Sequence, residues 1–223
     1  MIPGPAIKKI VTEFDNNITC LSSPAFRFEY LNKYKPSNIK NENNNIFNIL
    51  VTLPISVTSS KAILTLLSEI SYSLKNFEKN ILINIRKHPG SLINLKNYIN
   101  NKNNTMIKIS NFSNILDCYK QNDILLTEAS ATAIEAIVLG IPTITIGANL
   151  PGIIDDPIPD EITQELVIRV KTKSQLISQI KRLSLIKKSK LNELFNTSII
   201  LKELYFTTVS RTNAEKLFDQ LNI

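Results

Sequence analysis

Residues 122–160 read NDILLTEASATAIEAIVLGIPTITIGANLPGIIDDPIPD, and this stretch contains a complete strand–helix–strand unit. We predict apolar strands at Asp123–Thr127 and Pro142–Ile146, with an apolar helix, Ala131–Leu139, between them. The Gly-Ile-Pro sequence ends that helix, because glycine suits the position after a helix and proline stops its continuation. Such a unit places a helix N-terminus at the carboxyl end of a parallel strand, where unpaired amides and the helix dipole favour an anion. The stretch therefore predicts an α/β fold with an anion-binding turn.

The same alternation of apolar strands and helices extends in both directions from this unit. Four more strands are predicted at Ile46–Leu53, Asn80–Ile85, Thr105–Ile109 and Leu166–Val170. Further helices are predicted from Ser59 or Ser60 to Phe77, from Ser91 to Ile99, and at Ile115–Tyr119, Ser174–Leu185, Lys190–Leu204 and Thr212–Leu221. Strands buried on both faces that alternate with helices indicate an open parallel sheet. We therefore expect a Rossmann-like α/β domain with helices on both faces and a helical C-terminal tail.

Residues 1–45 do not fit this pattern. They contain a predicted helix at Ile7–Phe14, a short apolar segment at Ile18–Leu21 and a polar stretch rich in Asn and Lys. One helix and one short apolar segment are too few to bury a hydrophobic core of their own. We therefore interpret residues 1–45 as the tail of a preceding N-terminal domain plus a linker, and residues 46–223 as a nucleotide-binding domain.

Composition narrows the choice of partner and compartment. The net charge of +7 and the isoelectric point near 9.3 permit an anionic partner, but no RNA-binding aromatic signature accompanies the dispersed basic residues. We therefore expect no nucleic acid. Cys20 and Cys118 lack zinc-ligand spacing, and the chain has no signal-like N-terminus and no long apolar run. These features predict a cytoplasmic protein and leave peripheral contact with an inner membrane open.

Known catalytic motifs are also missing. The sequence contains no GxxxxGK[ST], GxGxxG, HExxH or GxSxG, which argues against P-loop NTPases, typical dehydrogenases, zincins and α/β-hydrolases. Paired acids occur at Asp155, Asp156, Asp160 and Glu161. They suggest a metal or a general base, but without a further ligand cluster we interpret them as a solvated loop and predict no metal site and no cofactor.

His88 is the single histidine of the chain and directly follows a predicted buried strand. Pro89 favours an extended backbone before it, and Gly90 allows a tight turn behind it. An imidazole at the carboxyl edge of a sheet can hydrogen-bond a phosphate or act as a general acid or base near neutral pH. The alternative is a loop histidine without a role, and the sequence favours neither.

Ser130, Thr132 and Glu135 lie at the start of the central helix. The two hydroxyls can hold phosphate oxygens, while Glu135 is the one charged residue of an apolar helix and needs a partner. A ribose diol, which donates two hydrogen bonds to a carboxylate, would provide one. The alternative is structural, because Thr132-Ala133-Ile134-Glu135 matches a capping box.

Together these motifs resemble the donor-binding, C-terminal domain of GT-B-fold glycosyltransferases. The similarity is to bacterial surface-polysaccharide enzymes of the sialyl- and Kdo-transferase-like type and to glycerophosphotransferases of teichoic acid synthesis. Arg86–Gly90 resembles their His-Pro motif, Thr127–Pro142 their phosphate- and ribose-binding stretch, and Ser22–Arg27 the segment that ends their N-terminal domain.

The resemblance implies a role for each candidate residue. His88 would contact the donor phosphate or assist the leaving group, Ser130 and Thr132 would bind phosphate, and Glu135 would bind the ribose. It also implies a CMP-, CDP- or UDP-linked sugar donor, a glycan acceptor, no metal, and an N-terminal half or membrane surface as a further partner.

The chain departs from that family in three respects. Six residues separate Glu128 from Glu135, whereas retaining enzymes often carry two glutamates separated by seven, so Glu128 receives no sugar-binding role. The loop after the first strand lacks the usual glycines, and we expect the acceptor-binding N-terminal domain to lie outside this chain. Two alternatives therefore remain. One is a non-catalytic nucleotide-binding or interaction module of the same fold. The other is an enzyme similar to UDP-N-acetylglucosamine 2-epimerases, which usually carry a Gly-Gly pair where this chain has Ala131-Thr132.

Overall fold

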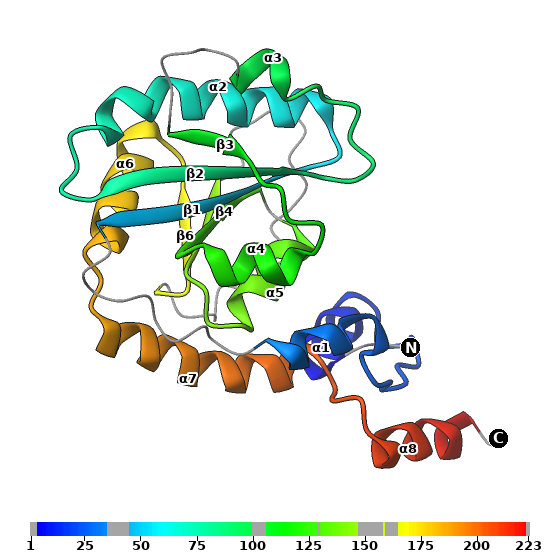
Figure 1. Cartoon of the computed structure of the whole chain (residues 1–223). Helices are drawn as coiled ribbons and strands as arrows, with labels where there is room; N and C mark the ends of the chain where they lie inside the picture. The colour runs from blue at the N-terminus through cyan, green and yellow to red at the C-terminus, as the bar shows by residue number, and fades with distance from the viewer. Residues whose placement is uncertain are drawn as a thin grey trace.

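The computed structural model describes residues 4–34, 45–99, 106–128, 130–146, 158 and 165–221. These residues form one open parallel sheet of six strands with helices on both faces (Figure 1). The strand order is β3-β2-β1-β4-β5-β6, and every neighbouring pair is parallel. The predicted Rossmann-like α/β fold with a helical C-terminal tail is confirmed.

The strands are β1 (Ile46–Leu53), β2 (Asn80–Lys87), β3 (Ile107–Ile109), β4 (Ile124–Thr127), β5 (Thr143–Ile146) and β6 (Val167–Val170). The helices are α1 (Pro5–Phe14), the 3₁₀ helix η1 (Phe26–Lys33), α2 (Val57–Leu74), α3 (Lys96–Ile99), α4 (Ile115–Gln121), α5 (Ala131–Ile137), α6 (Lys173–Ser184), α7 (Lys188–Tyr205) and α8 (Arg211–Leu221). Most predicted boundaries fall within a few residues of these. Within the described ranges, no helix combines the length and apolar character that crossing a bilayer requires.

The predicted start of the first long helix was wrong. Ser56 is the N-cap of α2, and its Oγ accepts a hydrogen bond from the amide of Ser59 at 3.3 Å. Ser59 and Ser60, the residues predicted to cap this helix, are instead buried in its first turn. The connection after β1 is therefore shorter than predicted, and α2 begins close to the carboxyl edge of the sheet.

The predicted cap of the next helix was also wrong. The chain stays irregular after the turn at His88, and α3 begins only at Lys96. The Oγ of Ser91 accepts from the amide of Ile93 at 3.4 Å, and Asn94 Oδ1 accepts from the amide of Lys96 at 3.1 Å. Asn94 is thus the side chain that satisfies the first amide of α3.

Two hydrophobic layers sandwich the sheet, because successive strand residues point to opposite faces. Ile49 and Val51 of β1 pack in one layer with α2 and α6, whereas Leu50 packs in the other with α4, α5 and α7 (Figure 1). Leu31 of η1 is fully buried in that second layer. Helix η1 therefore packs as an integral part of this face of the molecule.

The strand order places a topological switch point between β1 and β4. The chain moves outward from β1 to β2 and β3, and then returns to β4 on the other side of β1 before it continues to β5 and β6. Open α/β sheets bind ligands at the carboxyl ends of the strands beside such a point. In this protein, α2 and α5 begin there, directly after β1 and β4.

Candidate functional site

A row of polar residues crosses the sheet close to its carboxyl edge. In the strand register, Arg86 of β2 is next to Thr52 of β1, which is next to Thr127 of β4, Thr145 of β5 and Arg169 of β6. Neighbours in a parallel register point to the same face of the sheet. Most of these side chains find protein partners: Thr52 bonds to Thr127, and the two arginines bond to main-chain carbonyls. The row lies at the edge where open α/β sheets bind ligands.

Four hydroxyl groups form a chain at the switch point. Thr52 Oγ1 donates to Thr127 Oγ1 at 2.8 Å, Thr127 Oγ1 and Ser130 Oγ lie 3.3 Å apart, and Ser130 Oγ donates to Thr132 Oγ1 at 3.2 Å. Ser130 occupies the N-cap position of α5, but its side chain caps none of the helix amides. The two residues predicted to bind phosphate therefore lie together, with their hydroxyls bound to one another rather than to the end of the helix.

The capping-box alternative for Thr132 and Glu135 was wrong. The N-cap of α5 is Ser130, so Thr132 is the second residue of the helix and Glu135 the fifth. Glu135 is instead 9% exposed, and its Oε2 accepts a hydrogen bond from the Tyr119 hydroxyl at 3.2 Å. The hydroxyl of Tyr30 from η1 bonds to the same carboxylate. The structure thus supplies protein partners for the charge that the sequence left unexplained.

These contacts decide the protonation of the Glu135 group. Burial raises the pKa of the Glu135 carboxyl, while the hydrogen bonds from Tyr30 and Tyr119 and the charge of Arg27 lower it. Burial first, and then the negative charge of Glu135, raise the pKa of both tyrosines above their usual value, so the two hydroxyls stay protonated and remain donors. A carboxylate offers about four acceptor positions, so two tyrosines leave room for further donors.

Glu128 directly follows β4 and was not assigned a role from the sequence. It is 8% exposed, and its Oε1 is buried without a hydrogen-bond partner among the described residues. The carboxylate receives a hydrogen bond from the side chain of Ser59, and burial raises the pKa of Glu128 more than that bond lowers it. The signal that could have identified Glu128 is an acid placed directly at the end of a buried strand beside the switch point.

Thr145 carries the second buried oxygen of this kind. Its Oγ1 has no partner within the described part of the chain, and the residue is 2% exposed. Native proteins leave few buried polar atoms unsatisfied, and each one calls for an explanation. Both such atoms among the described residues lie at the carboxyl ends of adjacent strands, Glu128 directly after β4 and Thr145 within β5.

Two hydrogen bonds to main-chain groups hold His88 at the end of β2. Its amide donates to the carbonyl of Leu53 at 3.1 Å, and its Nδ1 accepts from the amide of Gly90 at 3.0 Å. Because Nδ1 is the acceptor, the neutral ring carries its proton on Nε2. Gly90 approaches closely, since a Cβ there would lie 3.2 Å from Ile55 Cδ1 and 3.4 Å from His88 Nδ1. The exposed ring therefore offers an N–H donor on the strand that neighbours β1.

The predicted acidic loop, with Asp155, Asp156, Asp160 and Glu161, lies outside the described residues. In the parts that the structure does describe, no three His, Cys, Asp or Glu side chains are grouped as metal ligands.

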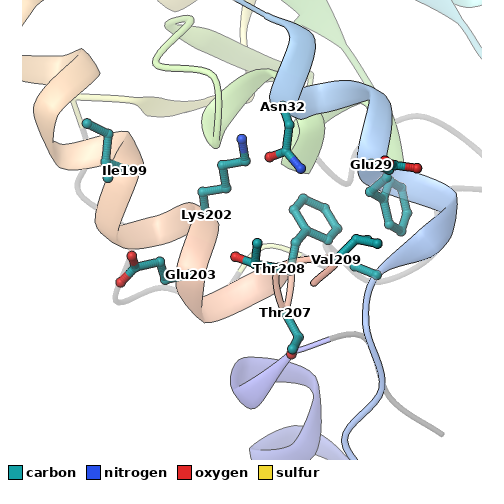
Figure 2. Close-up of a pocket in the computed structure, with 11 residues that line it drawn as sticks. Glu29, Asn32, Ile199, Lys202, Glu203, Thr207, Thr208 and Val209 are labelled. Carbon is teal, nitrogen blue, oxygen red and sulfur yellow. The ribbon is translucent and has the colours of Figure 1, made fainter. Parts of the chain in front are cut away.

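A pocket of about 140 Å³ lies away from the carboxyl edge, between η1 and the C-terminal end of α7 (Figure 2). Figure 2 shows Lys202 on α7 pointing toward Asn32 of η1, with Glu29 and Glu203 at the rim. The Lys202 ammonium lies 3.5 Å from the carbonyl of Leu31, and burial lowers the pKa of the lysine. The pocket is lined by charges of both signs, and Lys202 already contacts a main-chain carbonyl of η1. We therefore interpret the pocket as part of the packing between η1 and α7 rather than as a ligand site.

Solved structures with similar folds are enzymes of nucleotide sugars and glycosyltransferases. The chain is similar to Methanocaldococcus jannaschii UDP-GlcNAc 2-epimerase in complex with UDP-GlcNAc and UDP, with a TM-score of 0.59 and 18% identity over 99% of this chain and 59% of that one. It is similar to S. aureus MnaA with UDP, with a TM-score of 0.58 and 12% identity over 98% and 58%. It is also similar to the glycosyltransferase SnogD from Streptomyces nogalater, with a TM-score of 0.56 and 12% identity over 98% and 54%.

Sequence comparison adds no closer relative. No protein-family model matches the chain, and no curated protein matches it in sequence. The structural similarity therefore establishes the fold, that of GT-B glycosyltransferases and UDP-GlcNAc 2-epimerases, and not a reaction. The chain spans between 54% and 59% of the length of these three structures.

Proposed function

We propose that this chain is the donor-binding half of a GT-B glycosyltransferase that transfers a sugar from a CMP-, CDP- or UDP-linked donor to a surface polysaccharide or glycan. The observation that carries the proposal is the chain of hydroxyls from Thr52 through Thr127 and Ser130 to Thr132 at the topological switch point. Hydroxyl donors at this point of an open sheet are suited to phosphate oxygens. The nucleotide-sugar enzymes with the same fold support this choice of ligand class.

Each candidate residue has a distinct role in the proposal. Ser130 and Thr132 turn their hydroxyls from one another to the donor phosphate. His88 donates its Nε2 proton to a phosphate oxygen and stabilises the negative charge that develops on the leaving nucleotide. The acceptor positions of Glu135 that Tyr30 and Tyr119 leave open receive the two hydroxyls of the ribose.

The division of the chain follows from the same proposal. Residues 46–223 form the donor domain, and residues 1–45 connect it to a half that binds the acceptor, either a separate chain or a preceding domain at the cytoplasmic face of the inner membrane. In this arrangement the chain alone binds nucleotide and transfers sugar slowly or not at all, because the reacting acceptor is held by the other half.

Isothermal titration of the full chain with CMP, CDP and UDP tests the proposal. We expect one of the three to bind, and we expect the double variant Ser130→Ala/Thr132→Val to weaken binding at least tenfold, since it removes two donors to phosphate. Ser71→Ala is the matched control, because it removes an exposed hydroxyl that bonds to the Ser68 carbonyl on α2, away from the proposed site. Absence of binding by all three nucleotides contradicts the proposal.

A UDP-N-acetylglucosamine 2-epimerase-like activity is the second candidate, favoured by the similarity to the Methanocaldococcus jannaschii epimerase. The two candidates differ in whether the chain needs a second half. Incubation of the full chain with UDP-N-acetylglucosamine, followed by proton NMR of the sugar, separates them: a new epimeric sugar supports the epimerase, and an unchanged spectrum together with UDP binding supports the donor half. For a non-catalytic nucleotide-binding or interaction module, His88→Ala and Glu135→Ala would leave every measured property except stability unchanged.

A further inference from the structure

Glu128 lies where a bound anion would have to be accommodated. It directly follows β4, beside β1, and its carboxylate bonds to Ser59 in the first turn of α2. Helix α2 has 18 residues, and the first amides of an α-helix have no acceptor within the helix. A helix N-terminus that favours an anion thus lies against a buried acid, a combination that phosphate binding alone does not explain.

The immediate surroundings of Glu128 do not suit an ionised carboxylate. Ser59 is a single neutral donor, and its hydroxyl also lies 3.3 Å from Ser56 Oγ, so its one proton is shared between two acceptors. Oε1 is buried without a partner among the described residues. An ionised carboxylate that lacks donors is expensive to bury, whereas a protonated carboxyl carries one donor of its own and needs fewer.

Other charged groups do not offset this cost. The titratable and charged side chains on the adjoining elements are Lys61, Glu69 and Tyr72 of α2, Arg86 and Lys87 of β2, His88 after it, and Glu135 of α5. None of them contributes to the pKa of Glu128, which responds first to burial and then to the bond from Ser59. The protonation of Glu128 is therefore set by its own burial, and an anion brought to the end of α2 would be the nearest charge to act on it.

We propose that Glu128 takes up a proton when a phosphate-bearing anion binds beside α2, and that the protonated carboxyl donates a hydrogen bond to a phosphate oxygen. The inference rests on the proposed function in one respect, that the carboxyl edge is where phosphate binds. A negative charge within a few ångströms disfavours the ionised carboxylate, so binding and protonation support each other. The proton comes from the solvent, and no covalent bond changes. Glu128 is in this way a specificity residue for phosphate and a source of pH-dependent affinity.

A carboxylate that stays ionised and accepts hydroxyls of the donor sugar is the competing explanation of Glu128. The two explanations differ in proton count, because hydroxyl recognition requires no proton. They also differ in the effect of Glu128→Gln. The amide can donate as the protonated acid does, but it cannot replace the negative charge or both acceptor oxygens that a carboxylate offers to hydroxyls.

Proton uptake is measured by titrating the full chain at pH 7 in PIPES, HEPES and Tris, whose ionisation enthalpies differ. The dependence of the binding enthalpy on the buffer enthalpy gives the protons taken up per site. The probes are CMP, CDP, UDP and inorganic pyrophosphate, and thermal melting shows first that each variant is folded. We expect the wild type to take up about half a proton or more relative to Glu128→Gln, and we expect the affinity of that variant to stay within about threefold of wild type.

His88→Asn is the matched control, because His88 is another titratable group at this edge and is proposed to contact phosphate. The His88→Asn variant should bind the probes more weakly and still take up the proton. Loss of proton uptake in His88→Asn overturns the inference. Equal proton uptake in the wild type and Glu128→Gln overturns it as well. Large loss of binding in folded Glu128→Gln overturns it in favour of hydroxyl recognition. Pyrophosphate binding with proton uptake but no nucleotide binding supports the inference and refutes the proposed function. Nucleotide binding without proton uptake refutes the inference and supports the proposed function. Absence of binding by every probe refutes both.

Discussion

Glu128 and Glu135 are buried to almost the same extent, 8% and 9% exposed, and yet their surroundings differ. Glu135 receives the hydroxyls of Tyr30 and Tyr119 in the layer that η1, α4 and α5 share. Glu128, at the edge where strands end, has the shared proton of Ser59 and an oxygen without a partner among the described residues. In the packed layer, the protein itself supplies the partners of the buried Glu135. At the carboxyl edge, the unpaired oxygen of Glu128 calls for an explanation, and the proposed phosphate contact provides one.

The largest effect that tests this comparison should come from Tyr119→Phe. The change leaves the buried Glu135 with one donor fewer, and a hydrogen bond to a charged group contributes about 2 kcal/mol to the free energy of unfolding. Urea denaturation should show a loss of that size. Tyr72→Phe is the control, because Tyr72 is 78% exposed and should change stability by less than about 0.5 kcal/mol. A Tyr119→Phe protein as stable as the wild type would show that Glu135 does not depend on the tyrosines.

A smaller effect should separate two threonines of the polar row. Thr52→Val removes the donor of the buried 2.8 Å hydrogen bond to Thr127 and should cost about 1 kcal/mol of unfolding free energy. Thr145→Val replaces a buried hydroxyl that has no partner in the described structure, so it should be neutral or stabilising. Both variants are compared by urea denaturation in the absence of nucleotide. Equal destabilisation by the two would mean that Thr145 has a partner in the free protein.

The smallest effect is in the pH dependence of stability. Burial raises the pKa of Glu128 in the folded state above the ordinary value of 4.5, so between these two pKa values the folded state binds more protons than the unfolded state. The contribution of Glu128 to stability is therefore fully present below pH 4.5 and is lost as the pH rises through the folded pKa.

Glu128→Gln lacks this loss, so its unfolding free energy relative to wild type should increase between pH 4.5 and pH 7. Glu135→Gln should show the same direction more weakly, because the Tyr30 and Tyr119 bonds and Arg27 favour the charged form. Thermal melts across this pH range measure the difference. A Glu128→Gln curve parallel to that of wild type contradicts the assignment of a raised pKa.

The sequence predicted those parts of the fold that depend on local pattern. The unit from β4 through α5 to β5 follows from its apolar runs and its Gly-Ile-Pro stop, and His88 was correctly expected at the carboxyl edge. The partner of Glu135 could not be predicted, because Tyr30 is 105 positions earlier in the chain and reaches α5 only through the packing of η1. The local Thr132–Glu135 pattern matches a capping box, but the N-cap of α5 in the structure is Ser130.

Glu128 shows a different limit of sequence reasoning. The spacing of the two glutamates differs from that of retaining enzymes and predicts no role for Glu128, although its burial and unpaired oxygen make it the less satisfied of the two. Spacing along a chain does not report which polar atoms the fold leaves without partners. That information exists only once the end of β4 and the first turn of α2 are placed side by side.

Amide chemical-shift mapping of the isotope-labelled full chain with CMP, CDP and UDP tests most directly whether the carboxyl edge is the nucleotide site. We predict that one nucleotide shifts the amides of Gly90, Glu128, Ser130 and Thr132 and leaves those around the η1–α7 pocket unchanged. Shifts confined to that pocket, at residues such as Asn32 and Val209, or no shifts with any of the three nucleotides, would contradict the assignment of this edge as the binding site.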